Sequence, residues 1–452
     1  MYRSISLKRG LDLRLRGGIA PGAETAAVKP DRVAMVPDDF PGFTPRVAVK
    51  AGDHVDAGQA LMTDKVNPAI TVVSPVSGTV EDIVRGERRK VLRIVVKADE
   101  GAPCEAHPGK PASTPEAVRE SLMTAGLWVM MRQLPYDIVP DAQAVPRDIF
   151  VTAFDSAPLA SPLMGRVEGK EAAVKAGLRV LASLTKGKVY VSVSDEAAAA
   201  KLDCEADNIE TVIIAGHHPA GLASIQADNI APVNKGETVW MLDIETAGRI
   251  GSLVTDGTCS WATTVAITGS DVTTPHETVT VTGAEIAPLI KGQLSADAHH
   301  KRIIAGNVLT GFKESAEGFL RYPYRQLTVI PEGDDVDEFM GWASLSTKKM
   351  SESRSFLSRL FPRRLFAPDA RINGGRRAMI MSGLYEKTLP MDIMPEHLIK
   401  AILSRDIDRM EALGIYEVTP ADFALCEYVD PSKLELQKIV REGLDYLRKE
   451  LS

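Results

Sequence analysis

The sequence predicts a multi-domain protein of the α/β and α+β classes, and three observations support this prediction. The chain has 452 residues, which at about 150 residues per domain corresponds to about three domains. Short β-branched segments separated by Gly, Pro and Asp run from 28 to 98, whereas strand and helix patterns alternate from 114 to about 250. From 392 to 449 apolar residues recur at helical spacing, which predicts a helical C-terminal domain.

Composition excludes several other classes of protein. Lys and Arg number 53 and Asp and Glu number 60, so the net charge of −7 argues against general nucleic-acid binding. No apolar run reaches the length of about 18 residues that a membrane-spanning helix needs. The basic N-terminus lacks the apolar stretch of a secretory signal. The four cysteines, at 104, 204, 259 and 426, are far apart and form no CxxC motif, so we expect reduced thiols and no local zinc or iron–sulfur motif.

The first two segments are an N-terminal arm and a small β domain. Residues 1–27 mix basic residues with Gly and Pro, and we expect an extended arm with little structure of its own. Residues 28–98 alternate apolar and polar side chains between Gly and Pro turns, which predicts short strands. A Pro- and Gly-rich linker, 99–113, follows this domain.

The pattern then changes to alternating strands and helices, which is typical of βαβ units and a mainly parallel sheet. Thr114 and Pro115 supply a helix-start signal at the beginning of this domain, which we place at 114–254 and expect to be Rossmann-like. The expected strands are 149–152, 188–193, 210–214 and 238–242, and the expected helices are 170–184 and 196–206.

The last three segments are a second small domain, a linker and a helical domain. Residues 255–330 return to strand patterns with one short helix at 285–291, and we expect a β-grasp domain of the SLBB kind. Residues 331–377 form a charged, irregular linker, and 378–452 form the C-terminal helical domain. No internal repeat is evident.

Within the first β domain, three turns resemble those of the lipoyl/biotinyl carrier, or barrel-sandwich, domain. They are Gly52–Val55, Asp64-Lys65 and Ser74–Gly78. One hypothesis is that Lys65 carries a prosthetic group, as the lysine of a carrier domain does. The alternative is the same fold without the group, and it is favoured because the hairpin beside Asn67-Pro68 is longer than the carrier pattern.

Further stretches along nearly the whole chain resemble one family, the A subunits of the Na⁺-translocating NADH:quinone oxidoreductase. The family is related to the C subunit of the Rnf electron-transport complex and to the flavin-carrying NADH-dehydrogenase subunit of complex I. The stretches that carry the resemblance are Gly126–Pro135, Gly216–Gly221, Val239-Trp240, Ala305–Gly311, Leu327–Gly333, Asn373–Ala378, Leu389–Ile393 and Ala424–Lys433.

The resemblance implies a peripheral subunit on the cytoplasmic face of the bacterial inner membrane. Its partners would be the other subunits of a six-subunit complex that oxidises NADH, reduces ubiquinone and exports Na⁺. The isolated chain is expected to have no catalytic residue. The FMN, FAD, riboflavin and iron–sulfur centres of the family are expected on those partners.

Two departures from the relatives explain why we expect no redox centre in this chain. The flavin-binding relatives have a glycine-rich loop where this chain has Trp128, Met130 and Met131, and a phosphate cradle needs close backbone approach and free N–H groups. In the region of the Rnf cysteine clusters only Cys426 is present, and one thiolate cannot hold a cluster. The alternatives are an Rnf-type subunit, a stand-alone flavoprotein NADH dehydrogenase and a carrier-domain acyltransferase component.

The stretch Gly216–Gly221 is the expected site of quinone binding. It follows a predicted strand, and the loop after a parallel strand is a usual ligand position. His217 and His218 could donate hydrogen bonds to a quinone carbonyl, with Pro219 and Gly221 shaping the loop. The alternative is a plain Gly/Pro turn. The pair His299-His300 is interpreted as loop content, and we expect no metal site because neither His pair has a third ligand at a telling spacing.

The linker contains a basic, aromatic segment that we interpret as a docking surface. Between 348 and 377 nine residues are basic and two are acidic, and Phe and Leu alternate with the arginines. Arg359, Phe361, Arg363 and Arg364 are the candidates for contact with a partner subunit or the membrane surface. The alternative is a linker whose aromatic residues pack on its own domains. Pro362 is expected to interrupt a long helix.

Overall fold

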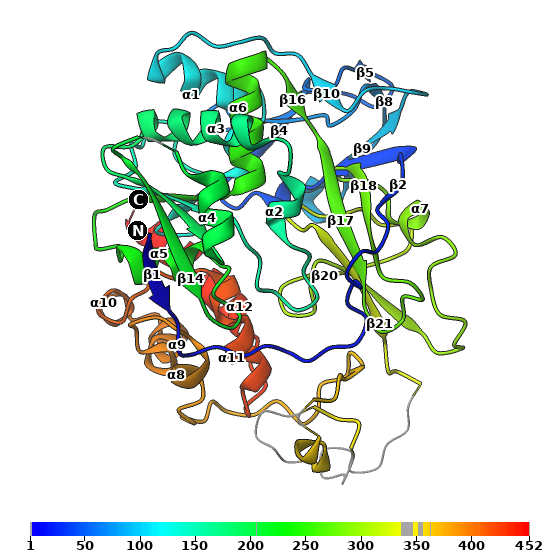
Figure 1. Ribbon diagram of the computed structural model, residues 1–452, viewed down its shortest axis with the longest axis vertical. Helices are drawn as coiled ribbons and strands as arrows, with labels where there is room; N and C mark the ends of the chain where they lie inside the picture. The colour runs from blue at the N-terminus through cyan, green and yellow to red at the C-terminus, as the bar shows by residue number, and fades with distance from the viewer. Residues whose placement is uncertain (1, 205, 336–346, 351–355, 362, 452) are drawn as a thin grey trace.

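The structure is a computed structural model that describes residues 2–204, 206–335, 347–350, 356–361 and 363–451. Figure 1 shows a small β domain and an SLBB-type sheet beside a central α/β sheet, with the C-terminal helices below that sheet. Over these ranges, no helix combines the length and the apolar character that crossing a membrane requires.

The first domain is a sandwich of two small sheets, as the sequence predicts. One sheet has the order β3-β9-β8-β5 and the other has the order β4-β6-β7. Leu61, Val72 and Ile94 are buried in its core. The strands are β3 (Arg32–Met35), β4 (Pro45–Val47), β5 (His54–Val55), β6 (Ala60–Asp64), β7 (Thr71–Val73), β8 (Gly78–Arg85) and β9 (Val91–Ala98).

Lys65 lies on the turn between β6 and β7, and it is exposed. The buried carboxylate of Asp64 organises this turn by accepting hydrogen bonds from the backbone N–H groups of Val66 and Asn67, at 3.0 and 2.8 Å. The extra residues that lengthen the hairpin are therefore folded into a fixed turn.

The α/β domain has a six-stranded sheet of order β1-β14-β13-β12-β15-β11. All neighbours are parallel except β11, which is antiparallel to β15. The chain moves outward from β12 through β13 to β14 and then returns to the other side of β12 as β15, so the direction of strand order reverses between β12 and β15. The strands are β11 (Arg132–Leu134), β12 (Ile149–Thr152), β13 (Val189–Val193), β14 (Ile209–Ala215) and β15 (Val239–Asp243).

Helices cover both faces of this sheet because consecutive residues of its central strands, which point to opposite faces, are apolar. Ile149 and Val151 of β12 share a core with the helices α3 and α6, whereas Phe150 shares a core with α5 and the C-terminal helices. Thr114 caps α1 as predicted, since its side chain accepts the N–H of Ala117. The helices are α1 (Pro115–Thr124), α2 (Leu163–Arg166), α3 (Glu171–Leu184), α4 (Glu196–Leu202), α5 (Ala223–Ile230) and α6 (Ile244–Asp256).

The next domain is a six-stranded mixed sheet of order β2-β18-β17-β21-β19-β20. Helix α7 (Ile286–Ile290) packs on it, and Val265, Leu289 and Val329 lie in their common core. The strands after β16 (Cys259–Ser260) are β17 (Ala262–Thr268), β18 (His276–Val281), β19 (Lys301–Ala305), β20 (Phe312–Glu314) and β21 (Gln326–Pro331).

The first 27 residues, for which we expected an extended arm, contribute to two of these sheets. Strand β1 (Arg3–Ser6) pairs in parallel with β14, and β2 (Ala26–Ala27) pairs in parallel with β18. Figure 1 shows the arm in dark blue as it runs between the two sheets. Its secondary structure comes from the sheet edges that it joins, which local sequence does not reveal.

The C-terminal residues form the predicted helical domain, which packs under the α/β sheet. Gly443 brings α12 close to α9, because a Cβ at this position would lie 2.7 Å from Cγ2 of Ile402. The helices are α8 (Tyr385–Thr388), α9 (Pro395–Ser404), α10 (Ile407–Ala412), α11 (Ala424–Val429) and α12 (Leu436–Leu451), with the 3₁₀ turn η6 (Pro420–Phe423) before α11.

Candidate functional site

A cavity of about 350 Å³ lies where the α/β sheet, the SLBB-type sheet and the C-terminal helices meet. Its α/β wall includes the segments that follow β12 and β14 and the last three residues of β15, at the carboxyl edge of the parallel strands and at the point where the strand order reverses. Open α/β sheets bind ligands at this position. The walls from the other two domains include Gly306, Asn307, Tyr324, Thr419 and Ala421.

Of the four predicted quinone-binding residues, His218 and Gly221 line this cavity. His217 is exposed and pairs instead with the N-terminal arm, where its Nδ1 lies 2.6 Å from Asp12 Oδ2. Pro219 follows a cis peptide bond and is not part of the cavity wall. The predicted loop therefore reaches the cavity through His218 and Gly221, and the sequence pattern did not distinguish the two histidines.

Ser156 fixes the loop at the cavity. Its hydroxyl oxygen accepts the backbone N–H of Gly221 at 2.8 Å and lies 3.0 Å from Nδ1 of His218. A side chain at 221 would prevent this contact, because a Cβ there would lie 2.6 Å from the backbone nitrogen of Ser156. The loop Gly216–Gly221 is thus held against the loop that follows β12.

These contacts leave one ring nitrogen of His218 without a partner. The Ser156 hydroxyl, which accepts the N–H of Gly221, can either donate to Nδ1 of His218 or accept from it, because a hydroxyl oxygen has two lone pairs. The other ring nitrogen, Nε2, is buried and has no hydrogen-bond partner among the residues that the structure describes. Burial lowers the pKa of His218, although Asp155 and Asp12 oppose this effect, so the ring is neutral at pH 7 and offers one N–H donor.

A buried network of ion pairs lies between the α/β and SLBB-type domains. It was not predicted from the sequence. Arg325, just before β21, lies 2.9 Å from Asp243 Oδ2 and 2.7 Å from Glu245 Oε2 at the start of α6. Arg249, one turn along α6, lies 2.8 Å from the other oxygen of Glu245 and donates to the carbonyl of Ala262. The four-residue spacing of Glu245 and Arg249 on α6 is a signal for an ion pair that the sequence does contain. Nothing in the sequence indicates that Arg325 joins this pair.

The network keeps its carboxylates ionised despite their burial. Burial is the largest single effect and disfavours the charge on Asp243 and Glu245, but the positive charges of Arg325 and Arg249, together with the N–H of Thr246 at Asp243, outweigh it and hold the pKa of both carboxyl groups below their usual values. Asp243 also caps α6, because its Oδ1 accepts the N–H of Thr246 at 2.8 Å. The nearby Arg166 is largely buried, and burial lowers its pKa to about 10.

The stretch Gly126–Pro135, where the flavin-binding relatives have a glycine-rich loop, is part of the hydrophobic core. Trp128 is fully buried, packs edge-on against Trp240 at 5.0 Å between ring centroids, and donates its indole N–H to the carbonyl of Pro140. Met130 and Met131 are also buried. These side chains occupy the space beside the backbone that a phosphate cradle would need.

The four cysteines are free thiols, and none of them forms a disulfide bond. Burial raises the pKa of Cys426 to about 12 and that of Cys259 to about 11, so both are protonated thiols at neutral pH. Across the described ranges, the one group of three His, Cys, Asp or Glu side chains with metal-ligand spacing contains no cysteine. Cys426 contacts the hydroxyl of Thr388 at 3.6 Å, which is a packing role.

The proposed docking segment has an exposed centre and buried ends. Phe356 and Phe366 are buried, and Phe366 lies under the guanidinium of Arg14 in a cation–π contact. Between them Phe361, Arg363 and Arg364 are exposed, together with Leu360 and Leu365. The side chain of Arg359 and the whole of Pro362 lie outside the described residues. The two buried Phe side chains anchor the segment and leave the apolar side chains between them facing solvent.

Comparison with known proteins identifies the class to which this fold and cavity belong. Family models match in the order of the domains: the NqrA N-terminal barrel-sandwich hybrid domain over 5–99, the NqrA second alpha/beta domain over 113–259, and the NQRA C-terminal domain, of the SLBB kind, over 264–316. This class combines a barrel-sandwich domain, an α/β domain and an SLBB domain, as the sequence predicts.

The full-length relatives include the A subunits of the Na⁺-translocating NADH-quinone reductases of three bacteria. Identity is 34% for Neisseria meningitidis serogroup A, 36% for Serratia proteamaculans and 37% for Hahella chejuensis, in each case over 99% of this chain and 100% of the relative. The chain therefore belongs to the family of A subunits of the Na⁺-translocating NADH-quinone reductase. A solved NAD⁺-reducing [NiFe]-hydrogenase chain aligns over 75% of this chain and 61% of its own length at 11% identity, with a TM-score of 0.38, which is too weak to bear on function.

We expect Arg325→Met to destabilise the protein by about 3–5 kcal/mol at pH 7, because it leaves the buried carboxylate of Asp243 without its ion-pair partner and leaves Glu245 with Arg249 alone. The pKa values of Asp243 and Glu245 are depressed in the folded state, so their contribution is present above their unfolded values and is lost as the pH falls through the folded ones. The difference in the free energy of unfolding between variant and wild type should therefore shrink below about pH 4. Urea unfolding followed by tryptophan fluorescence measures this free energy.

The matched control is Arg409→Met. This arginine is 77% exposed and pairs with Asp406 on the surface, so its replacement should change stability by less than about 0.5 kcal/mol. Equal effects of the two substitutions would contradict the role given to the buried network.

Proposed function

We propose that this chain works as the A subunit of a Na⁺-translocating NADH:quinone reductase, on the cytoplasmic face of the bacterial inner membrane. In the complex, electrons pass from NADH to ubiquinone and Na⁺ leaves the cell. The chain carries no redox centre of its own and supplies two surfaces, a quinone-binding cavity at His218 and a docking segment around Phe361. The names of the relatives, which align over 99% of the chain, support the overall assignment.

The absence of a flavin is supported by what fills the loop Gly126–Pro135. Trp128 is buried against Trp240, so binding FMN there would require removing both rings from the core. Exposing such a pair costs several kcal/mol, since an aromatic residue replaced by Ala in a core costs about 3–5 kcal/mol. A binding site would therefore have to unfold part of the domain.

We expect the purified chain to show a featureless visible absorption spectrum above the aromatic band. The same measurement after incubation with excess FMN and desalting should also show no retained flavin. A flavin or iron–sulfur band in the isolated chain would contradict this part of the proposal and would place the electron path within this chain.

The quinone assignment places the ring proton of His218 on Nε2, the buried nitrogen that has no hydrogen-bond partner among the described residues. A quinone is a flat, uncharged ring with two carbonyl acceptors, and a neutral imidazole donor matches such an acceptor without bringing in a charge. Leu163, Leu222 and Met241 supply apolar wall around it. A buried donor without a partner costs free energy that a carbonyl ligand would recover.

We expect His218→Leu to weaken binding of a short-chain ubiquinone analogue about tenfold or more, because losing a buried hydrogen bond costs about 1–1.5 kcal/mol. Titration calorimetry on the purified full chain measures the affinity. His217→Leu is the control, because this residue lies on the same loop outside the cavity wall and should leave the affinity unchanged. As a second test, Ala160→Phe should reduce binding by filling the cavity. Unchanged affinity in His218→Leu and Ala160→Phe would contradict the assignment.

The docking surface is the exposed centre of the segment between Phe356 and Phe366. Phe361 is 49% exposed and Leu360 is 65% exposed, and two arginines follow them closely. Apolar side chains rimmed by positive charge fit a partner that offers an apolar groove with acidic edges at the membrane. We assign Arg359, Phe361, Arg363 and Arg364 to this contact.

We expect the triple replacement Arg359→Glu, Arg363→Glu and Arg364→Glu to release the chain when the complex is purified through one of its other subunits. Its control replaces Arg85, Arg88 and Arg89 with Glu on the β8–β9 hairpin, which makes the same change of charge at an exposed site far along the chain. Phe361→Asp tests the apolar part of the contact. Full retention of both docking variants would argue against this surface.

A further inference from the structure

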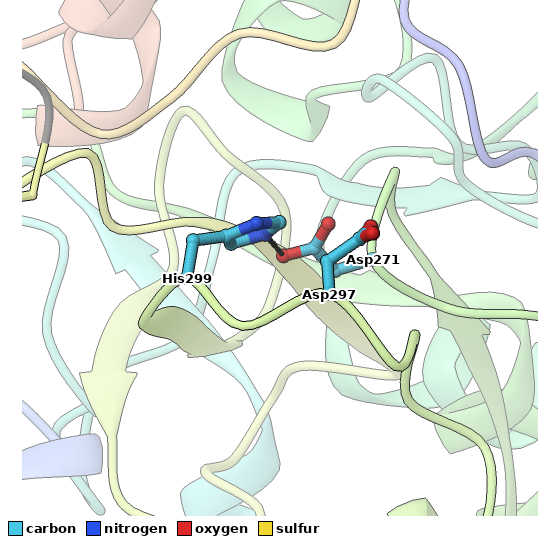
Figure 2. Close-up of side chains that lie close together, drawn as sticks. All are labelled: Asp271, Asp297 and His299. Atoms are coloured by element: carbon cyan, nitrogen blue, oxygen red, sulfur yellow. Dashed lines mark hydrogen bonds and ion pairs between the residues drawn. The ribbon is translucent and has the colours of Figure 1, made fainter.

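A cluster of three metal-ligand side chains lies at one end of the SLBB-type sheet, away from the cavity. Asp271, Asp297 and His299 place one ligand atom each within 4.8 Å of the others. Figure 2 shows the imidazole of His299 hydrogen-bonded to the carboxylate of Asp271, with Asp297 beside them. The sequence separates Asp271 from the other two, so the folded sheet creates a grouping that spacing along the chain does not indicate.

The backbone fixes these residues in place. Asp271 lies in the turn after β17, where its N–H donates to the carbonyl of Val329 and its carbonyl accepts the N–H of Ser295, at 3.1 and 2.8 Å. The N–H of Thr273 donates to the carbonyl of Gln293 at 2.8 Å, which also ties the turn to the 293–299 loop. A site held in this way is preorganised, so a ligand does not have to order it.

The cluster has more negative charge than its surroundings balance. His299 Nε2 lies 2.7 Å from the buried carboxylate of Asp271, and no ion pair involving the carboxylate of Asp297 is found within the described part of the chain. Lys301 does not neutralise Asp297, because its ammonium donates to the backbone carbonyls of Asp297 and His299. One imidazole therefore faces two carboxylates.

We propose that Asp271, Asp297 and His299 bind a divalent transition-metal ion of the Zn²⁺ type. One imidazole with two carboxylates suits Zn²⁺, whereas Ca²⁺ and Mg²⁺ prefer sites built from oxygen alone. Asp297 is exposed, so its side chain has room to close onto the ion, and solvent supplies the remaining coordination positions. The ion ties the turn after β17 to the loop that leads into β19, which makes it a structural clamp on the SLBB-type domain.

Calorimetric titration of Zn²⁺ into the full chain, first stripped with a chelator, tests the proposal. A Cys104→Ser background removes the one cysteine that is not buried. We expect one saturable site, a melting temperature that rises with Zn²⁺, and weaker binding of Mg²⁺ and Ca²⁺. Asp297→Asn and His299→Gln should each weaken Zn²⁺ binding at least tenfold and abolish the rise in melting temperature.

The control is His300→Gln, which alters the next residue along the chain. His300 is exposed and pairs with Asp334 at 3.0 Å, outside the cluster, so its replacement should leave Zn²⁺ binding unchanged. Asp297 is exposed, so Asp297→Asn should fold normally and be decisive even if substitution of the buried Asp271 fails to fold. Absence of a saturable site would overturn the proposal, and so would equal Zn²⁺ affinity in the wild type, Asp297→Asn and His299→Gln.

Discussion

The arrangement of the domains depends on the buried contact between Arg325 and the start of α6. Arg325 meets Asp243 and Glu245 at 2.9 and 2.7 Å, in a place where burial disfavours the charge of both carboxyl groups. Burying these charges is costly, so the contact is favourable only when the SLBB-type domain sits in one orientation on the α/β domain. Tyr322, three residues earlier, adds a hydrogen bond from its hydroxyl to the carbonyl of Met130.

This orientation produces the cavity. The carboxyl edge of a parallel sheet is open in an isolated α/β domain, and here the segment Tyr322–Gln326 and the 3₁₀ turn η6 close it on two sides. His218 is held at the edge by Ser156 and by the N-terminal arm, since a carboxylate oxygen of Asp12 accepts the backbone N–H of His218 at 3.0 Å. Three domains therefore form the walls of the cavity, and the N-terminal arm holds His218 in place. A change in any of these four parts alters the shape of the cavity.

The loop Gly126–Pro135 shows how the same scaffold can hold a cofactor or a core. A glycine-rich loop exposes backbone N–H groups to a phosphate, whereas Trp128, Met130 and Met131 cover that backbone with apolar side chains. Gly126 still adopts a positive φ of 74°, so one feature of a tight turn is kept. In this chain the side chains of the loop pack between the barrel-sandwich and α/β domains.

The sequence by itself determined the domain types, because β-branched alternation, strand–helix alternation and helical periodicity are local properties of the chain. It also led to the predictions of a ligand-binding role for the loop Gly216–Gly221 and of a missing glycine-rich loop at Gly126–Pro135, since both predictions rest on consecutive residues. The tertiary structure alone decided which histidine lines the cavity, that the first 27 residues join two sheets, and that Arg325 meets Asp243. These depend on contacts between residues far apart in sequence, where charge and burial are set by the packing of whole domains rather than by neighbouring residues.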